Sequence, residues 1–579
     1  MSVTIGTVVG TSARRGHGAP PQAGRRHGPR GRRSLLPAVW GAALMAAGLG
    51  ALLVASALQP AGPRLAGANT AIGQGADDPR DISAHNSPTV VANPADPANL
   101  AVVNRVDSPT FSCALHVSFD AGASWQQTPV PFPEGEELPE RCFAPDAVFT
   151  ADGTLHVSFV TLAGRGNVPH AVWVASSPDG GAGLGQPVRA GGPQAFQVRL
   201  AADPTDADRL YLSWVQAGEV GPLGFPEAAN PVQVSRSDDA GATWSAPVAV
   251  NDPARLRVLA PSTAVGDDGA VYVLYLDLRD DRLDYHGAHE GRGGPAYPGP
   301  WSLVLARSDD GGATWRETVV DDALVPAERI VAFFPPSPSL AVHGERVYAA
   351  FHDARGGGAD VWLWASADAG ASFGPPRRVN DTPAHDATWQ YLPAVAVAPG
   401  GRVDVAYYDR RADAGNVMNE VSLQSSRDAG RTFGPHLRLS DRAFDSRIGF
   451  GSERGLPDLG SRLGLVSTDR GSLAVWADTR AGTEASNKQV LAQAVAVHAA
   501  APLPPGPLRV GGLAAVIAGL AALLWWASGA AGSRRQPPAA TPPAAGNPWA
   551  ASQVGGDVSS GEVVTGDPGR GARRQRETT

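Results

Sequence analysis

Four short segments place a guanidinium two residues after a carboxylate, and they are the strongest candidates for chemistry in this chain. Alternate residues of a strand point the same way, so the two side chains of each segment can share one environment. Arginine binds carboxylates through paired hydrogen bonds, and aspartate can act as acid or base. The pattern therefore predicts either a ring that binds a carboxylated ligand or internal pairs that lock neighbouring elements, and its repetition favours the internal pairs. These D-x-R segments are Asp277-Leu278-Arg279, Asp353-Ala354-Arg355, Asp409-Arg410-Arg411 and Asp478-Thr479-Arg480.

A second pattern, S-x-D-x-G-x-[ST]-[WF], recurs six times at intervals of about sixty residues, with the second copy degraded. A tight turn needs side-chain acceptors for its free backbone N–H groups and a glycine where φ is positive. The terminal aromatic residue starts the next strand and is expected to pack between neighbouring sheets. The acids predicted to organise these turns are Asp120, Asp179, Asp239, Asp310, Asp368 and Asp428.

This turn pattern resembles the Asp box, or bacterial neuraminidase repeat, of the sialidase-like propellers, over roughly residues 85–500. The resemblance implies an all-β propeller, and it also occurs in propellers that hydrolyse nothing. Between the turns lies a second signature, a short strand usually opened by proline and followed by a strand ending in an aromatic residue. Its seven copies run Ser87–Asn104, Pro145–Phe159, Val198–Trp214, Pro261–Tyr275, Pro338–Phe351, Pro393–Tyr407 and Leu456–Trp476.

Seven copies favour seven blades over the alternative of six, with about 59 residues for each four-stranded blade. The seventh blade has no Asp box, and its third strand, 490–497, ends just before a proline-rich stretch. We therefore expect its missing strand to come from before Ser87, within Ile72 to Ser83. Such closure leaves no exposed sheet edge.

The sialidase resemblance implies three arginines around the substrate carboxylate, a tyrosine nucleophile with a glutamate, and an aspartate acid/base. Several of these signatures are missing. Neither Arg329-Ile330 nor Arg447-Ile448 is followed by the proline of the usual Arg-Ile-Pro sequence, and no tyrosine follows Tyr408. Tyr391 or Tyr408 with Glu420 is a conceivable pair, but Tyr391 is expected to pack beside its strand. The catalytic residues are therefore not assigned from the resemblance.

The flanks of the chain predict a membrane protein. Residues 1–33 hold seven arginines and no acid, and the uncharged run 35–58 that follows is long enough to cross a bilayer. It fits a signal peptide, with Ala55-Ser56-Ala57 as a cleavage site, and a retained anchor equally well. A second apolar run, 510–532, precedes Arg534 and Arg535, which places the polar tail in the cytoplasm. The propeller is then extracytoplasmic, at the cell membrane.

Cysteine usage and charge agree with that location. The two cysteines, Cys113 and Cys142, can pair in an oxidising compartment. The chain carries a net charge of −8, of which residues 1–33 contribute +7 and residues 533–579 contribute +2, leaving −17 for the remainder. So acidic a surface argues against nucleic acid as a partner.

No cofactor and no metal site is predicted. The loop between Asp277 and Trp301 is rich in potential ligands, but their spacing matches no recognised metal loop, so a solvated acidic turn is favoured. His352 and His385 stand alone and are expected to be structural. The loop's potential ligands are Asp280, Asp281, Asp284, Tyr285, His286 and His289.

Two functional hypotheses follow. The first is a membrane-anchored extracellular module that binds a glycan or a protein, attached through its C-terminal helix. The second is a sialidase-type glycoside hydrolase or a lyase-like relative. The intact scaffold without catalytic signatures favours the first. The predicted parts are a disordered cytoplasmic N-terminus (1–33), a signal peptide or transmembrane helix (34–58), a linker and closing strand (59–84), the propeller (85–500), a proline-rich linker (501–509), a transmembrane helix (510–532) and a disordered cytoplasmic tail (533–579).

Overall fold

The computed structural model describes residues 35–57, 62–73, 82–218, 230–281, 297–327, 336–449, 459–498 and 505–532. The predicted termini, 1–33 and 533–579, lie outside these residues, as do most of the proline-rich linker, Asp284, Tyr285, His286 and His289. Contacts divide the chain into two units. One contains two helices, and the other, between 58 and 504, is all-β.

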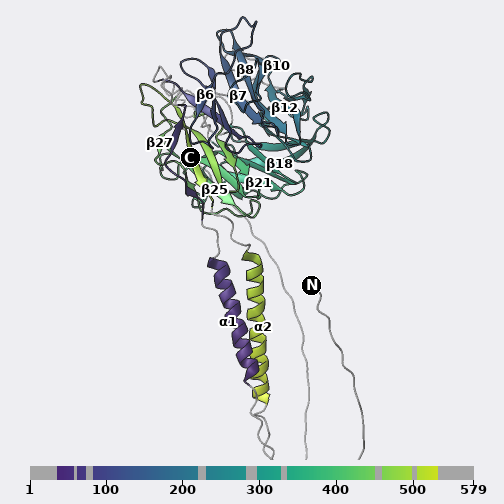
Figure 1. The fold of residues 1–579 in the computed structure, drawn as a ribbon, viewed down its shortest axis with the longest axis vertical. Coiled ribbons are helices and arrows are strands. Elements are labelled where there is room, and N and C mark those ends of the chain that lie inside the picture. Colours follow the sequence, from purple (N-terminus) through teal and green to yellow (C-terminus); the bar gives the residue numbers. More distant parts are fainter. Residues whose placement is uncertain are drawn as a thin grey trace, which may run out of the picture. The chain divides into compact units, whose positions relative to one another are not determined.

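The β unit is a seven-bladed propeller, as predicted, and the six-bladed alternative is wrong (Figure 1). The described strands form seven antiparallel sheets. The first three sheets contain β3 (His85–Ala92), β4 (Leu100–Val106), β5 (Ser112–Ser118) and β6 (Gln126–Thr128); β7 (Cys142–Phe149), β8 (Leu155–Ala163), β9 (Val168–Ser177) and β10 (Val188–Gly191); and β11 (Ala195–Asp203), β12 (Asp206–Gln216), β13 (Val232–Ser237) and β14 (Val248–Ala249).

The next three blades repeat this order, and a short extra strand pairs with the sixth. Their strands are β15 (Val258–Val265), β16 (Val271–Asp277), β17 (Trp301–Ser308) and β18 (Arg316–Leu324); β19 (Ser339–His343), β20 (Arg346–Asp353), β21 (Asp360–Ser366) and β22 (Arg377–Arg378); and β23 (Gln390–Val397), β24 (Val403–Asp409), β25 (Met418–Ser426), β26 (Leu437–Arg438) and β27 (Phe444–Asp445).

The seventh blade is closed by strands from the N-terminal side of the propeller, which removes the free edge. The strands β1 and β2 both pair with β30, so the closing segment lies earlier than the expected window of 72–83 and shares only Ile72 with it. Residues 74–81 are outside the described part. The strands of this blade are β1 (Arg64–Leu65), β2 (Thr70–Ile72), β28 (Gly464–Ser467), β29 (Gly471–Asp478) and β30 (Val490–Val497).

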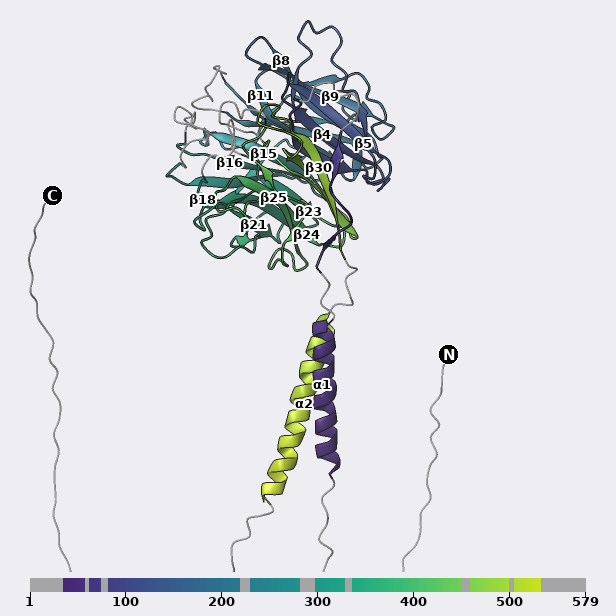
Figure 2. The same cartoon turned by 90° about the vertical axis from the view of Figure 1, so that its left-hand side faces the viewer.

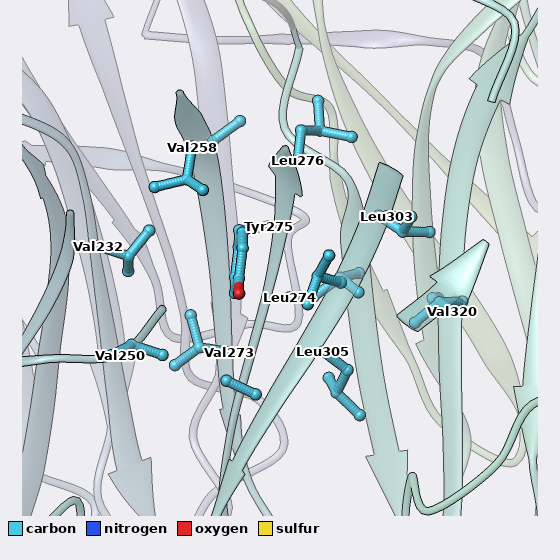
Figure 3. Close-up of a cluster of buried hydrophobic side chains, with 14 of the residues drawn as sticks. Val232, Val250, Val258, Val273, Leu274, Tyr275, Leu276, Leu303, Leu305 and Val320 are labelled. Carbon is cyan, nitrogen blue, oxygen red and sulfur yellow. The ribbon is translucent and has the colours of Figure 1, made fainter. Parts of the chain in front are cut away.

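The core lies between adjacent blades. Strand β16 is buried along its whole length, because it is rich in β-branched and aromatic residues that pack on both faces. Figure 3 shows Val273 on the side of Val232 and Val250, which belong to the third blade, whereas Leu274 faces Leu305 of its own blade's next strand. Each blade is therefore stabilised largely through its neighbours.

The six repeated turns connect the third and fourth strands of the first six blades. In the first copy, the Ser118 hydroxyl donates to Asp120 (2.8 Å) and accepts from the Gly122 amide (2.8 Å), while Ser124 donates to Asp120 through its amide (2.8 Å) and hydroxyl (2.6 Å). Hydrogen bonds from the Ser124 hydroxyl and amide and from Ser118 lower the pKa of Asp120 to about 2. The degraded second copy keeps the serine-to-aspartate bond but lacks the final hydroxyl.

The second unit contains α1 (Leu36–Ala57) and α2 (Pro505–Gly532), which pack against each other (Figure 2). Each includes an uncharged stretch long enough to span a membrane, Leu36–Leu53 and Val510–Ser528. The described part of the chain thus has two candidate membrane spans.

Candidate functional site

The D-x-R segments lie where the sequence predicts them, directly after the second strands of blades four to seven. The aspartates are the last residues of β16, β20, β24 and β29, and all four are buried. In each segment the backbone amide of the arginine donates to its own aspartate, at 2.9–3.2 Å. The chain therefore makes a small turn that brings the two side chains of each segment to the same place.

Three of the four arginines are held between two carboxylates. Arg355 contacts Asp353 (2.6 Å) and Asp321 (2.9 Å), and Arg411 contacts Asp409 (2.5 Å) and Asp381 (2.6 Å). Arg480 contacts Asp478 (2.6 Å) and Asp441 in the same way. The second acid of each set belongs to the outer strand of the preceding blade or directly follows it. We call these three sets of residues the interblade clamps.

In the Arg411 clamp, the pKa shifts favour the charged forms of Asp381 and Arg411. Burial alone would raise the pKa of Asp381, but hydrogen bonds from Arg411 and His436 outweigh it and lower the pKa to about 2. Burial likewise opposes the charge of Arg411, while the neighbouring Tyr407 and Asp409 raise its pKa above the ordinary value. Both groups are therefore ionised at neutral pH.

The fourth D-x-R segment, Asp277-Leu278-Arg279, makes different contacts. Arg279 donates to the Ser302 hydroxyl (2.9 Å) and to the carbonyl oxygen of Asp322 (2.8 Å). Its partner Asp277 instead binds Arg255 (2.8 Å), which also binds Glu317 (2.8 Å). No three of the four D-x-R arginines are shown converging on one free carboxylate in the described structure, so whether these segments bind a ligand stays a prediction.

A different set of charged residues lines the central channel, and sequence reasoning missed it. A cavity of about 340 Å³ is lined by residues at or next to the innermost strands of all seven blades. Its charged lining residues within the described part of the chain are Asp146, Arg199 and Arg462. They come from the second, third and seventh blades, so the site combines different residues from different blades.

A backbone irregularity that recurs in five of the innermost strands orients the side chains that line the cavity. The pairing of β3, β7, β11, β15 and β23 with their neighbours shifts register near the strand start. Each shift contains a non-glycine residue with φ of 49–58°, in the left-handed region that such residues rarely adopt. Bulges of this kind redirect side chains and occur beside active sites. The residues redirected into the cavity are Thr89, Asp146, Arg199, Ser262 and Ala394.

Asp146, the aspartate of the channel, has several contacts within the protein. Asp146 accepts hydrogen bonds from the Thr89 hydroxyl (2.7 Å) and from the amide of Leu200 (3.0 Å). Arg462 lies 3.9 Å from it. The carboxylate is therefore held by contacts from the first, third and seventh blades.

The two channel arginines have mostly neutral partners. Arg199 donates to the carbonyl oxygen of Pro261 (3.2 Å) and to the Ser337 hydroxyl (2.8 Å). Arg462 donates to the carbonyl oxygen of Pro145, and its buried Nε has no hydrogen-bond partner among the described residues. Burial, and next the charge of Arg199, lower the pKa of Arg462 to about 9. Among the described residues that line the cavity, two guanidiniums thus face one carboxylate, so this lining carries a net positive charge.

The residues expected for a sialidase nucleophile lie elsewhere. The Tyr391 hydroxyl donates to Asn419 (2.7 Å), and its ring stacks on Tyr408 with centroids 5.4 Å apart in a core cluster. Glu420 pairs with Arg438 (3.1 Å). Among the described residues that line the channel there is neither a tyrosine nor a glutamate.

The remaining candidates have structural contacts. Cys113 and Cys142 form the predicted disulfide. His352 is buried beside Phe351 and Tyr391, and burial lowers its pKa to about 4. Asp281 accepts from the Trp301 indole (3.1 Å). No cluster of three metal-ligating side chains occurs in the part of the chain that the structure describes.

Comparison with known proteins finds solved structures that resemble this chain at low sequence identity and establishes no activity for it. No family model and no curated protein matches the sequence. A protein of unknown function from Dyadobacter fermentans is 16% identical over 76% of this chain and 100% of its own, with a TM-score of 0.44. The Hadza microbial sialidase Hz136 is 15% identical (69% and 74% coverage, TM-score 0.37), and a PL25 ulvan lyase is 12% identical (73% and 95%, TM-score 0.43).

Proposed function

We propose that this protein is a membrane-anchored, sialidase-like propeller that binds a carboxylated ligand, an acidic glycan, in its central channel. The observation that carries the proposal is that Arg199 and Arg462 face one cavity whose described lining contains a single carboxylate, Asp146. Guanidiniums bind carboxylates strongly, through charge-assisted and often paired hydrogen bonds. A carboxylated ligand would supply the missing negative charge.

Binding without hydrolysis is the activity that the residues support. Asp146 already accepts two hydrogen bonds from within the protein. A glycosidase needs either two carboxyl groups with different pKa values or a tyrosine nucleophile with its base. The described channel lining offers one carboxylate and no tyrosine. The sialidase-type hydrolase therefore remains the alternative that the experiment below must separate.

Under the same proposal, the six repeated turns are Asp boxes and the interblade clamps are structural. The hydrogen bonds of the first serine and the central aspartate side chains in each turn stay within one hairpin, and each clamp joins two blades. The disulfide and the basic flanks of the two apolar helices support a propeller on the extracytoplasmic side. The net charge outside the termini still argues against nucleic acid.

The test uses the full chain in detergent and paired oligosaccharides that differ only in a carboxylate. We expect binding of a sialylated or uronate-containing sugar, no binding of its neutral counterpart, and no turnover of a fluorogenic sialoside. Turnover that disappears in Arg462→Met would establish the hydrolase instead. Failure to bind any acidic sugar would contradict the proposed ligand class.

A further inference from the structure

The two apolar helices contact each other through glycines. A Cβ atom built on Gly48 would lie 2.6 Å from the carbonyl oxygen of Gly512, and one built on Gly519 would lie 2.5 Å from that of Gly41. The reverse distances are also short. A Cβ atom built on Gly41 would lie 2.9 Å from the carbonyl oxygen of Gly519, and one built on Gly512 would lie 2.9 Å from that of Gly48. The backbones therefore touch at two levels, and no larger residue fits at any of the four positions without a shift.

The order of these contacts makes the pair antiparallel. The earlier glycine of α1, Gly41, lies opposite the later glycine of α2, Gly519, and Gly48 lies opposite Gly512. In both helices the glycines are seven residues apart, about two helical turns, which places them on one face. Small residues on one face let transmembrane helices approach closely where no hydrophobic effect drives them together.

The surfaces that do not touch the partner helix are apolar. Leu36, Val39 and Leu53 of α1 are exposed, as are Leu513, Ile517 and Leu524 of α2. Only 11% of each candidate span is buried. The 22 residues of α1 extend about 33 Å, close to the thickness of a bilayer's hydrocarbon core. Lipid acyl chains are the surroundings that fit this surface.

The cleavage site suggested by the sequence lies within the paired helix α1. The residues Ala55-Ser56-Ala57 form the end of α1. Cleavage after Ala57 would remove the helix that covers Gly512 and Gly519. The basic residues of 1–33 and Arg534-Arg535 flank the same end of the antiparallel pair, as expected when both chain ends remain on one side of the membrane.

We propose that α1 and α2 cross the membrane as one antiparallel pair, joined at Gly41, Gly48, Gly512 and Gly519, and that the N-terminal span is therefore kept in the mature protein. The propeller is then tethered at both of its ends. Its partner surface is the lipid bilayer, and both chain termini lie on the face opposite the propeller.

The first test is the mass of the full chain isolated from membranes, with a different epitope at each end. We expect both epitopes on one polypeptide, with identical responses to protease added from either side. A chain that starts after Ala57 would overturn the proposal. So would end epitopes on opposite sides of the membrane.

A cross-link tests the pairing itself. A Cβ on Gly512 would lie 3.3 Å from the Cβ of Ala51, so the pair Ala51→Cys and Gly512→Cys can form a disulfide after a small adjustment. The matched control is Ala51→Cys with Gly511→Cys, because a Cβ on Gly511 meets nothing within 4 Å. A protease site inserted after Gly218 reports the bond, since Cys113 and Cys142 both lie in the first fragment.

We expect the Gly512 pair to keep the two fragments joined on a denaturing gel, at least about fivefold more than the Gly511 pair. Gly48→Leu should abolish that difference, whereas Gly50→Leu, which points into open space, should preserve it. Equal cross-linking of the two pairs, or none in either, would overturn the helix pairing.

Discussion

Arginines occur in two opposite settings within this propeller. Arg355, Arg411 and Arg480 each lie between two carboxylates, whereas Arg199 and Arg462 face a central cavity whose described lining holds one carboxylate, Asp146. Burying a charge is costly unless a partner compensates it. In the clamps, the charge of each arginine is balanced by carboxylates of the protein, and the ion pairs join two blades. The described lining of the channel instead carries two arginines and one aspartate. The difference separates an arginine that stabilises the fold from one available to a ligand.

The largest effect should come from breaking a clamp. Arg411→Met leaves Asp409 and Asp381 without their shared cation, and we expect the free energy of unfolding to fall by about 3 kcal/mol. Chemical denaturation measures it. Arg447→Met is the control, because its pair with Asp445 is largely exposed and should contribute much less. Equal losses in the two variants would mean that the clamps do not hold the blades together.

Acid should weaken the protein through buried histidine before it protonates Asp381 of the Arg411 clamp. Burial lowers the pKa of His352 to about 4, below its unfolded value of 6.5. The unfolded chain therefore binds more protons in this interval, and stability falls as the pH drops from about 6.5 to about 4. The Asp381 pKa of about 2 keeps its clamp charged there. The slope of unfolding free energy against pH should be smaller for His352→Phe, and an unchanged slope would contradict this assignment.

Removing a channel arginine should have the reverse effect of removing a clamp arginine. In Arg462→Met a buried cation, whose one charged partner is 3.9 Å away, is replaced by an apolar side chain of similar length, so we expect stability to stay the same or rise by about 1 kcal/mol. The same denaturation experiment measures it. A loss as large as that of Arg411→Met would show that Arg462 is structural.

The smallest expected effect is that of a simple carboxylate. Acetate, compared with chloride at equal ionic strength, should raise the melting temperature of the unaltered protein by about 1–2 °C, because it binds the folded state alone. Arg462→Met should abolish this difference and Arg411→Met should retain it. Persistence of the acetate effect in Arg462→Met would place the anion elsewhere.

The fold was largely predictable because its signals are local and repeated. Each turn carries its own serine, aspartate and glycine, and seven strand-pair copies predict seven blades. The closing strand was misplaced because pairing with β30 depends on packing and not on a local pattern. The D-x-R positions were predictable as strand ends, but their second acids were not, since Asp321, Asp381 and Asp441 come from preceding blades.

The charged residues of the channel belong to no local motif, so they are recognised only when the repeated strand signatures are compared with one another. Asp146 and Arg199 occupy the same second position in their copies of the strand signature that Ser262 and Ala394 occupy in others. Comparing that one position across the copies would have revealed two charged residues among neutral ones. That they meet in a cavity follows only from closing the ring of blades.

The central claim is tested most directly by titrating one carboxylated oligosaccharide into the full chain, Arg462→Met and Arg411→Met. The account predicts a Kd raised at least about tenfold in Arg462→Met, from the loss of a charge-assisted hydrogen bond, and unchanged in folded Arg411→Met. Weakened binding in Arg411→Met with unchanged binding in Arg462→Met would contradict the account and move the ligand site to the D-x-R segments.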